Sequence, residues 1–542
     1  MPSFAELADE FLEVEFAESP VRASGLGLTE YDERLDDLSE AAFERRRAAD
    51  VAWLQRFRVV DEQALGFADR IDRDLVVSIL RGRQIIEDFE VWRRQPDVYL
   101  NPGMTGIFSL FLHRLRPMDK LVDAAVARMR LIPGNLEDGK RNLRPDMVPG
   151  IFLDRAANQA RAGARYVREI LPAQMNDGPL RAKLAEAGEA AGSAYDEYVA
   201  FLEEMRPTAA GDYMLGEERY SALLREKELL GFGARELRDR GQAAYDGLAL
   251  DLTRCARELR GTDDWKAVLD ELNEDHPRTP EEMRVGYEEW TERAREYLRE
   301  HRLVTFPEGE SCAVVPSPPF QRPVLAVASY MSPPPFSDRM LGHFFVPFPP
   351  DGASEDEIQK RLASNSYPGI PTTAVHEAYP GHHLQLSAAV TNPSLVRLFS
   401  GAPEFAEGWA FYCERMMKEA GFDDSPNGWY IVHTDAIWRA TRILLDIQLH
   451  RGLIGFDDAV DRLVAETGFE RPAALAEIKR YTSTPTYQLS YLFGRHMIER
   501  LKSDVQHHSG ADFDLRRFHD TLLYGGTMPV SYARRLFDLN GR

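Results

Sequence analysis

Three histidines and a glutamate lie within eight residues of this chain, and they can act together only if the backbone adopts a particular local fold. The segment reads His376-Glu-Ala-Tyr-Pro-Gly-His-His, and Glu407 follows on a later segment. Two histidines, a carboxylate and an adjacent glutamate are the groups of a catalytic zinc site, which needs three protein ligands and a base for an activated water. The spacing differs from the HExxH motif, because a proline and a glycine stand between the histidines.

A regular α-helix cannot bring these histidines to one metal ion. Residues four apart share a helix face, whereas His382 is six residues from His376 and lies about 240° round the helix. His383 returns close to the correct face, but about 10 Å along the axis. Pro380 removes a helical hydrogen bond and Gly381 tolerates unusual backbone angles, so we expect a π-like bulge or a break at this point.

Such a distortion favours His382 as the second ligand, because absorbing two extra residues returns it to the position of the second histidine of HExxH. We expect His383 to support a ligand or to face the substrate, and an exchange of the two roles stays open. Glu377 lies beside the metal rather than at it, as a general base does. The alternative for Glu377 is a salt-bridge partner on a helix surface.

The third ligand is expected to be a carboxylate on a following helix, where Glu404, Glu407 and Glu414 are the candidates. We choose Glu407, because Gly408 after it permits close approach to the metal and Trp409 can exclude solvent. Glu414 is expected to orient a ligating imidazole. The sequence therefore predicts one Zn²⁺ per chain, held by two histidines and one glutamate.

The rest of the chain has the composition of a globular protein rich in helix. Of its 542 residues, 44% are hydrophobic and 28% charged, which excludes the disordered and fibrous classes. Up to about residue 300, apolar residues recur at three- and four-residue spacing, as in Leu184 to Met205. Proline and glycine fall between such segments, as at Asn101-Pro-Gly and Ile132-Pro-Gly-Asn, and there we expect turns.

The pattern changes between residues 301 and 350, where β-rich runs such as Val324 to Tyr330 alternate with proline clusters. Helical spacing then returns, for example in Tyr487 to Ser503. We therefore expect a helical scaffold at 1–300, a small antiparallel sheet at 301–350 beside the metal-binding helix, and a helical catalytic region at 351–542, joined in one continuous structural unit.

Charge and cysteine usage limit the partners and the location. The 66 Lys and Arg residues against 88 Asp and Glu residues give a net charge of −22, which argues against binding to nucleic acid or to an anionic membrane. The acidic amino terminus is unlike a signal peptide, and no stretch approaches the roughly 18 apolar residues of a membrane span, so we expect a cytoplasmic protein. The three separated cysteines predict neither a disulfide framework nor a thiolate zinc site. The oligomeric state is left open.

These motifs resemble the family catalogued as domain of unknown function 885, which is similar to the glutamate-ligand (gluzincin-type) zinc metallopeptidases related to angiotensin-converting enzyme and thimet oligopeptidase. The matching segments are His376 to Gln385, Glu407 to Glu414, Asp446 to His450, Arg480-Tyr with Pro485 through Ser490-Tyr491 and Gly494, and Phe518 to Leu523. The resemblance implies a mainly α-helical ellipsoid with a deep central channel, one zinc ion and peptidase-like hydrolysis.

The resemblance also implies roles for residues near the carboxyl terminus. Tyr491 resembles the tyrosine that hydrogen-bonds the oxyanion in related peptidases, and His450 is expected to assist it or to orient the site. The residues expected to bind substrate or to support the ligands are His383, Glu414, Arg439, Asp446, Gln488 and Arg495. Two departures bear on substrate contacts, because the chain has Gln448 where the family more often has glycine and Thr486-Tyr487 where it often has Gly-Gln.

The predicted function is zinc-dependent hydrolysis of peptide or peptide-like amide bonds in small substrates, with Glu377 as the general base. The alternatives are a non-peptide amide hydrolase of the same fold and a metal-binding protein without catalytic activity. An iron(II) oxygenase is a remote alternative, because its facial triad usually lies on a β-barrel and the paired Glu-x-x-His of helical di-iron proteins is absent. The sequence does not distinguish end-directed from internal cleavage.

Overall fold

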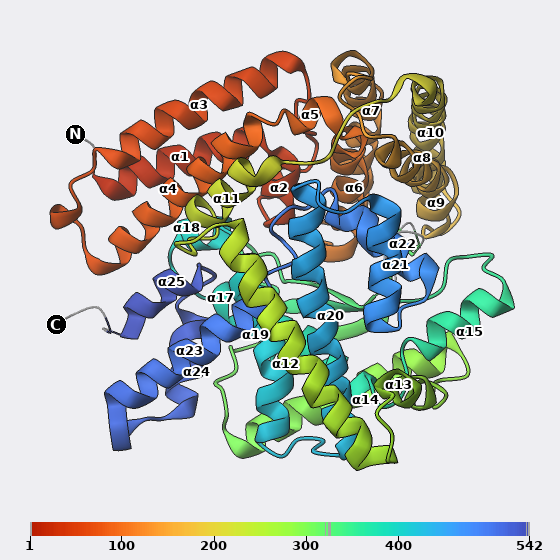
Figure 1. Ribbon diagram of the computed structural model, residues 1–542. Helices are drawn as coiled ribbons and strands as arrows, with labels where there is room; N and C mark the ends of the chain where they lie inside the picture. The colour runs from red at the N-terminus through yellow and green to blue at the C-terminus, as the bar shows by residue number, and fades with distance from the viewer. Residues whose placement is uncertain (1–2, 320, 323–326, 538, 540–542) are drawn as a thin grey trace. The chain divides into compact units, whose positions relative to one another are not determined.

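The computed structural model describes residues 3–319, 321–322, 327–537 and 539, and it is mainly α-helical with one small sheet (Figure 1). This confirms the predicted mainly α fold class. The chain forms two compact units, residues 1–213 with 334–339 and residues 214–333 with 340–542. All the residues predicted to form the metal centre belong to the second unit.

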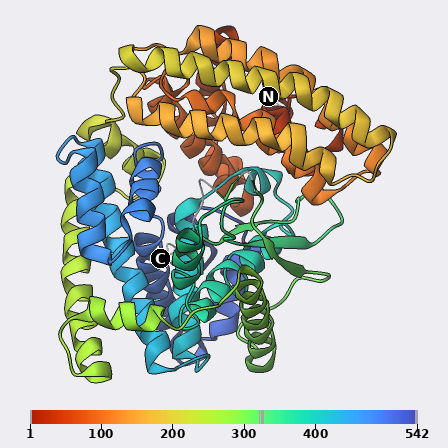
Figure 2. The same cartoon turned by 90° about the vertical axis from the view of Figure 1, so that its right-hand side faces the viewer.

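The first unit is built from helices that pack in pairs, such as α3 on α4, seen in Figure 1, and α7 on α10, seen in Figure 2. Its first helix begins with a capping box, in which the Ser3 side chain accepts from the Glu6 amide and the Glu6 carboxylate accepts from the Ser3 amide. The helices of this unit are α1 (Phe4–Glu18), α2 (Pro20–Gly25), α3 (Glu40–Arg58), α4 (Phe67–Glu87), α5 (Val91–Arg94), α6 (Asn101–His113), α7 (Met118–Asn142), α8 (Gly150–Arg165), α9 (Leu171–Ala173) and α10 (Pro179–Met205).

The turn predicted at Ile132-Pro-Gly-Asn is wrong, because α7 runs through Pro133 without ending. Met129, Ile132 and Leu136 are buried on one face of this helix, and their packing outweighs the hydrogen bond that the proline removes. The turn predicted at Asn101-Pro-Gly is also wrong, since α6 begins at Asn101 with proline in its first turn, where no amide hydrogen is needed.

The second unit surrounds α20, whose residues are buried along almost its whole length and which packs against α11, α12, α19 and α21 (Figure 1). A helix buried on all faces belongs to the centre of a core. The other helices of this unit are α11 (Gly216–Glu226), α12 (Ala234–Arg260), α13 (Trp265–Asn273), α14 (Pro280–His301), α15 (Glu355–Ala363), α16 (Ile370–Glu377), α17 (His382–Ala389), α18 (Leu395–Phe399), α19 (Pro403–Glu419), α21 (Phe456–Thr467), α22 (Arg471–Tyr481), α23 (Leu492–Ser509), α24 (Leu515–Tyr524) and α25 (Val530–Ala533), with α20 spanning Pro426–His450.

The sheet has three strands, β1 (Ser311–Pro316), β2 (Ser329–Met331) and β3 (Leu341–Val346), in the order β1-β3-β2. The predicted antiparallel sheet is wrong in part, because β1 pairs with β3 in parallel and only β2 is antiparallel to β3. The long connection from β1 to β3 includes β2 and returns the chain to the same end of the sheet, which parallel pairing requires. Residues 324–326 of the predicted run Val324 to Tyr330 lie outside the described residues.

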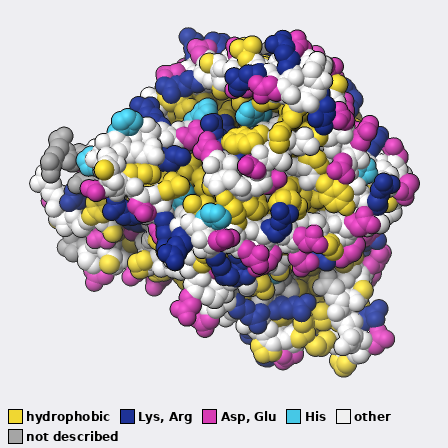
Figure 3. All heavy atoms as spheres, turned by 90° about the horizontal axis from the view of Figure 1, so that it is seen from below, with side chains coloured by type: hydrophobic (Ala, Val, Ile, Leu, Met, Phe, Trp, Pro, Cys, Tyr) yellow, Lys and Arg dark blue, Asp and Glu magenta, His cyan; other side chains and the backbone are white. Residues whose placement is uncertain are grey.

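The sheet packs against α14 and α17, which places it beside the second histidine helix. The rings of Tyr287 on α14 and Phe344 on β3 meet edge to face, with their centroids 5.3 Å apart. On the molecular face drawn in Figure 3, acidic and basic side chains are interspersed. Within the described ranges, none of the helices combines the length and the hydropathy of a membrane span.

Candidate metal centre

The helix is interrupted between α16, which ends at Glu377, and α17, which begins at His382. The expected distortion is therefore a break and not a π-like bulge. Ala378 leaves the helical region, with φ −117° and ψ −83°, and the Tyr379–Pro380 peptide is cis. The break brings the imidazole rings of His376 and His382 together, with centroids 4.8 Å apart and planes at 89°.

Gly381 and Trp409 hold this break in place. A Cβ atom at Gly381 would lie 1.9 Å from the His376 carbonyl oxygen and 2.4 Å from that of Val375, so only glycine fits there. The Gly381 amide donates to the Val375 carbonyl at 3.0 Å. Trp409, which we expected to exclude solvent, donates from Nε1 to the Pro380 carbonyl at 2.8 Å. A residue of α19 thus fixes the loop between the two histidines.

Glu407 completes a group of three side chains that could hold a metal ion. Its Oε2 atom lies 3.5 Å from Nε2 of His376 and 3.3 Å from Nε2 of His382, and the ligand atoms all lie within 4.8 Å of one another. Ligands about 2.0–2.1 Å from a tetrahedral zinc ion are about 3.3 Å apart, so these separations suit one ion. In the part of the chain that the structure describes, His, Cys, Asp and Glu residues form no other group of this kind.

The surroundings of Glu407 agree with a cation site. Oε2 is buried and has no hydrogen-bond partner among the described residues. Burial alone would raise the pKa of this carboxyl, but the imidazoles of His382 and His376 lower it far below its usual range. The group therefore presents one anionic oxygen and two ring nitrogens to the same point.

Glu414 lies two turns after Glu407 on α19 and contacts the first histidine from the other side. Its Oε1 atom is 2.7 Å from Nδ1 of His376, and the carboxylate is 2% exposed. This contact leaves Nε2 of His376 directed toward Glu407, which is the arrangement by which a carboxylate orients a ligating imidazole. Glu404, the other candidate on this helix, is not part of the metal-facing group, and its pKa is raised to about 8 by burial and by Glu228.

Gly408 does not serve the close approach to the metal that we expected. A Cβ atom there would lie 2.5 Å from the carbonyl carbon of Gly494 and 2.6 Å from its Cα atom. The two glycines instead let α19 and α23 cross at close range, because neither carries a side chain.

Glu377 is buried beside the metal-facing group, with 7% of its surface exposed. Its Oε2 atom has no hydrogen-bond partner in the described residues. Burial raises the pKa of this carboxyl, and the imidazoles of His376 and His382 offset part of the effect. A buried carboxylate with a raised pKa and an unpartnered oxygen has the properties of a proton acceptor.

Tyr491 and Tyr487 approach the group from the segment that precedes α23. The helix predicted over Tyr487 to Ser503 begins only at Leu492, so both tyrosines lie in a turn. The ring of Tyr491 faces that of His376, with centroids 6.3 Å apart and planes at 16°. The hydroxyl of Tyr487 donates a short hydrogen bond to Oε1 of Glu407. Sequence reasoning missed Tyr487, whose only sign was its place in a segment that departs from the family pattern.

His383 turns away from the metal-facing group and into a second buried network. Its Nε2 atom lies 2.8 Å from Oε2 of Glu310, and its Nδ1 atom lies 2.8 Å from the hydroxyl of Tyr330. Tyr379 donates to the same Glu310 oxygen at 2.6 Å, and Arg295 pairs with this carboxylate at 2.9 Å. Burial would raise the pKa of Glu310, but the hydrogen bonds from His383 and Tyr379 lower it to about 2. Sequence reasoning missed Glu310, which lies far from the histidine motif.

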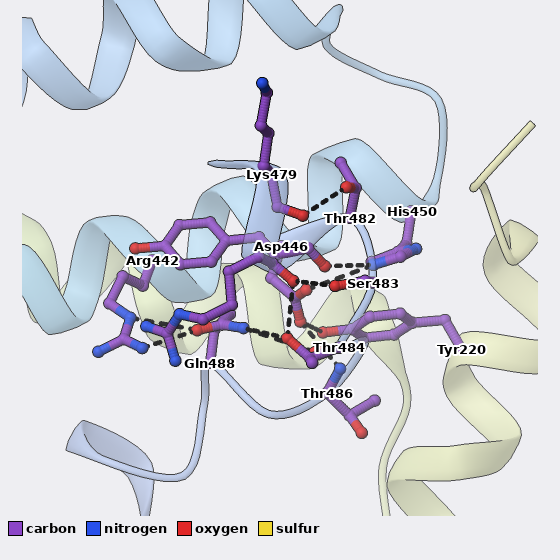
Figure 4. A network of polar contacts seen from close by, with 12 residues as sticks. Tyr220, Arg442, Asp446, His450, Lys479, Thr482, Ser483, Thr484, Thr486 and Gln488 are labelled. Atoms are coloured by element: carbon purple, nitrogen blue, oxygen red, sulfur yellow. Dashed lines mark hydrogen bonds and ion pairs between the residues drawn. The ribbon is translucent and has the colours of Figure 1, made fainter. Parts of the chain in front are cut away.

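His450 lies in a further buried network, drawn in Figure 4, with Asp446, Tyr481 and Tyr220. Its Nε2 atom is 3.0 Å from the Tyr481 carbonyl oxygen and 3.6 Å from Oδ1 of Asp446. Asp446 accepts from the hydroxyl of Tyr220 at 2.6 Å. Burial raises the pKa of Asp446 to about 7, against the effect of that hydrogen bond.

The arginines predicted to bind substrate are stacked on aromatic rings. The Arg439 guanidinium lies 3.8 Å from the centroid of Trp438 and pairs with Asp435, and Arg495 lies 4.5 Å from the centroid of Phe411. The predicted residue Gln488 accepts from a third arginine, Arg442, at 2.8 Å. Gln488 lies between the two tyrosines of the segment before α23, and Arg442 also contacts this segment through its guanidinium, 4.1 Å over the ring of Tyr491.

Comparison with known proteins gives a family and two similar folds. The family described as "Bacterial protein of unknown function (DUF885)" matches residues 20–536. A structure described as a "putative lipoprotein of unknown function" from Shewanella oneidensis is 22% identical, with a TM-score of 0.79, and the match covers 99% of this chain and 100% of that one. A "putative lipoprotein" from Colwellia psychrerythraea is 17% identical, with a TM-score of 0.81, and both chains are covered completely. At these identities the likeness shows the fold alone. None of the curated proteins matches.

Proposed function

Because the chain belongs to the DUF885 family, whose description assigns no function, we propose an activity from the metal-facing group itself: zinc-dependent hydrolysis of peptide or peptide-like amide bonds in small substrates. The observation that carries the proposal is the buried Glu377 carboxylate, whose Oε2 atom has no hydrogen-bond partner among the described residues and which directly follows a metal-facing histidine. A site that only stored a metal would not need this second, unpartnered carboxylate.

In this proposal His376, His382 and Glu407 hold the ion, and Glu414 fixes the orientation of the first histidine. A zinc ion bound there polarises a substrate carbonyl and makes water easier to deprotonate. Two nitrogen ligands and one carboxylate are the donor set that zinc takes in peptidases, and they leave one position open.

Side chains of the protein carry out the remaining steps of the proposed reaction. Glu377 takes the proton of the attacking water as the new carbon–oxygen bond forms, and it returns that proton to the nitrogen as the carbon–nitrogen bond breaks. Its pKa, which burial raises, supports a role as proton acceptor and donor. Tyr491 is proposed to donate a hydrogen bond to the substrate oxygen as negative charge develops on it. His450 is proposed to orient this region through Asp446.

The substrate is proposed to be a small peptide or amide, because the family resemblance implies a deep channel that folded proteins cannot enter. Arg439 and Arg495 are proposed to attract a substrate carboxylate, although both are stacked on aromatic rings in this structure. The net charge of −22 argues against nucleic acid and anionic membrane as partners, and a cytoplasmic location stays a prediction.

Metal analysis and a peptide screen test the proposal on the full chain. Wild type should carry one zinc per chain and cleave members of a mixed peptide library, detected by mass spectrometry. Glu377→Gln should keep the zinc and lose cleavage by about 10²–10⁴-fold, because only the proton transfer is removed. The exposed Glu419→Gln on α19 is the matched control and should behave as wild type. Cleavage that survives in Glu377→Gln would reject this residue as the base.

Two further outcomes would separate the alternatives. Zinc in wild type without any cleavage would indicate a non-peptide amide substrate or a metal-binding protein, and iron in place of zinc would favour an oxygenase. His382→Ala should lose the metal, whereas the matched His383→Ala should keep it, because His383 contacts Glu310. The reverse result would exchange their roles.

A further inference from the structure

The segment between α22 and α23 carries both site tyrosines, and one strained residue lies at its centre. Thr486 adopts φ +65°, in the left-handed region. This region is unfavourable for a β-branched residue, which keeps it only when neighbouring contacts enforce it. Thr486 is also fully buried, so contacts inside the protein must supply that enforcement.

Two buried carboxylates hold Thr486, and Figure 4 shows the contact with one of them, Asp446. Its backbone amide donates to Oδ2 of Asp446 at 3.0 Å, and its hydroxyl donates to Oε1 of Glu228 at 2.8 Å. Tyr220 donates to the same Asp446 oxygen at 2.6 Å. Asp446 is 0% and Glu228 2% exposed, and hydrogen bonds are strong where water is excluded.

The conformation of Thr486 sets the direction of the next residue, Tyr487. The Tyr487 hydroxyl donates to Oε1 of Glu407, while Oε2 of the same carboxylate faces the two histidines. The chain of contacts therefore runs from Asp446 through Thr486 and Tyr487 to a proposed metal ligand. Each link is a single hydrogen bond or a single peptide step.

We propose that Asp446, assisted by Glu228, is a positioning residue for the metal centre. It holds Thr486 in the left-handed conformation, which sets the Tyr487 phenol on Glu407 and fixes the orientation of that ligand. Metal affinity then depends on Asp446, although Asp446 is not a ligand. The inference rests on the proposed metal centre, but it does not depend on which bond the protein hydrolyses.

Zinc affinity of the full chain, measured by competition with a chromogenic chelator, tests the inference. Asp446→Ala and Tyr487→Phe should each weaken Zn²⁺ binding by about 10–100-fold, as losses of supporting contacts do. The double variant should bind Zn²⁺ about as tightly as the single variant with the lower affinity, because both changes break the same series of contacts. Asp446→Asn should stay close to wild type, since its amide oxygen can accept both bonds.

A pair of substitutions at Thr486 tests the backbone directly and avoids a buried cavity at Asp446. Thr486→Val loses the hydroxyl and keeps the β-branch, so it should weaken Zn²⁺ binding by about 10-fold. Glycine adopts positive φ at no steric cost, so Thr486→Gly should bind Zn²⁺ as tightly as wild type. Combined with Asp446→Ala, it should restore Zn²⁺ binding. Circular dichroism checks that each variant is folded.

Wild-type affinity in Asp446→Ala, multiplied effects in the double variant, or equal affinity of the Val and Gly variants would each overturn the inference. These results are separate from the test of hydrolysis. Affinities that change as expected in a protein that cleaves no peptide would reject only the proposed activity. Unchanged affinities in an active peptidase would reject only the role of Asp446.

Discussion

His376 uses its two ring nitrogens for different contacts. Nδ1 lies 2.7 Å from Glu414, and Nε2 faces Glu407 at 3.5 Å. The hydrogen bond at Nδ1 favours the tautomer with its proton on that nitrogen and leaves the lone pair of Nε2 available. The charge of Glu414 also makes the imidazole a better electron donor. Metal affinity should therefore depend on this second carboxylate.

Glu414→Gln is predicted to weaken Zn²⁺ binding by about 10–100-fold, because the amide keeps the shape of the carboxylate and loses its charge. Chelator competition on the purified chain measures the effect. Glu419→Gln, an exposed change on the same helix, should leave the affinity unaltered. Equal affinity of Glu414→Gln and wild type would mean that Glu414 serves stability alone.

At the scale of elements, the site depends on where helices approach closely. The break between α16 and α17 needs Gly381, and the crossing of α19 with α23 needs Gly408 against Gly494. The second contact matters because α19 carries Glu407 and α23 follows the tyrosine segment. A small change in this crossing would move Glu407 relative to Tyr487, which donates a hydrogen bond to it.

Gly408→Ala is predicted to destabilise the protein by about 1–3 kcal/mol, because its Cβ atom would lie 2.5 Å from backbone atoms that cannot move freely. Urea unfolding followed by circular dichroism measures the change. Gly247→Ala on α12, in the same unit, is the matched control, since a Cβ there meets nothing within 4 Å. That control should gain about 0.5–1 kcal/mol. A Gly408→Ala protein as stable as its control would contradict the close crossing.

Glu310, next to the first residue of β1, ties the sheet region to α17 through His383. Its pKa is lowered to about 2, so the folded state favours the ionised carboxylate. The stability that this provides is fully present above the pKa of the unfolded chain, about 4.3, and is lost as the pH falls toward 2. At neutral pH it corresponds to about 3 kcal/mol.

Glu310→Gln is therefore predicted to be less stable than wild type by about 3 kcal/mol at pH 7, and the difference should shrink as the pH falls from 5 to 2. Unfolding free energies measured across this range check the sign. The neighbouring Glu308 is exposed, and Glu308→Gln should follow wild type at every pH. If the two unfolding free energies instead differ by the same amount at every pH, the loss of stability in Glu310→Gln comes from packing and not from charge.

At the scale of the whole molecule, every residue of the metal-facing group and of its supports lies in the second compact unit. Binding to the folded state alone stabilises a protein in proportion to the logarithm of ligand concentration. A metal should therefore stabilise the fold of the second unit, residues 214–333 with 340–542, first. The first unit contributes no ligand to this group.

Zinc at about 100 times its Kd is predicted to stabilise the wild-type protein by about 2.7 kcal/mol and to raise its Tm, and a chelator should reverse the effect. Calorimetry measures the shift. His376→Ala should show no response to zinc, because a ligand is missing. Hydrogen exchange should slow in α16, α17 and α19, with α7 and α10 of the first unit as the internal control. A zinc response retained in His376→Ala would place the ion elsewhere.

The metal-facing residues could be predicted from the sequence, because helix geometry relates the spacing of residues to their positions in space. His376, His382 and Glu407 were predicted because Pro380-Gly381 interrupts a spacing that a continuous helix cannot use, and Glu414 because it lies two turns beyond Glu407. The mainly helical fold followed from three- and four-residue apolar spacing. The helix through Pro133 and the parallel pairing of β1 with β3 could not be predicted, because packing and chain connectivity outweigh local preference there.

The sequence by itself determined the donor types at the site and the need for a break between the histidines, since both depend on neighbouring residues. Only the tertiary structure decided which groups support them. Glu310, Tyr487 and the Asp446–Thr486 contact join segments separated by 40 to 80 residues. Hydrogen bonds over such separations leave no periodic pattern in one sequence, because the fold, not the spacing, brings their partners together.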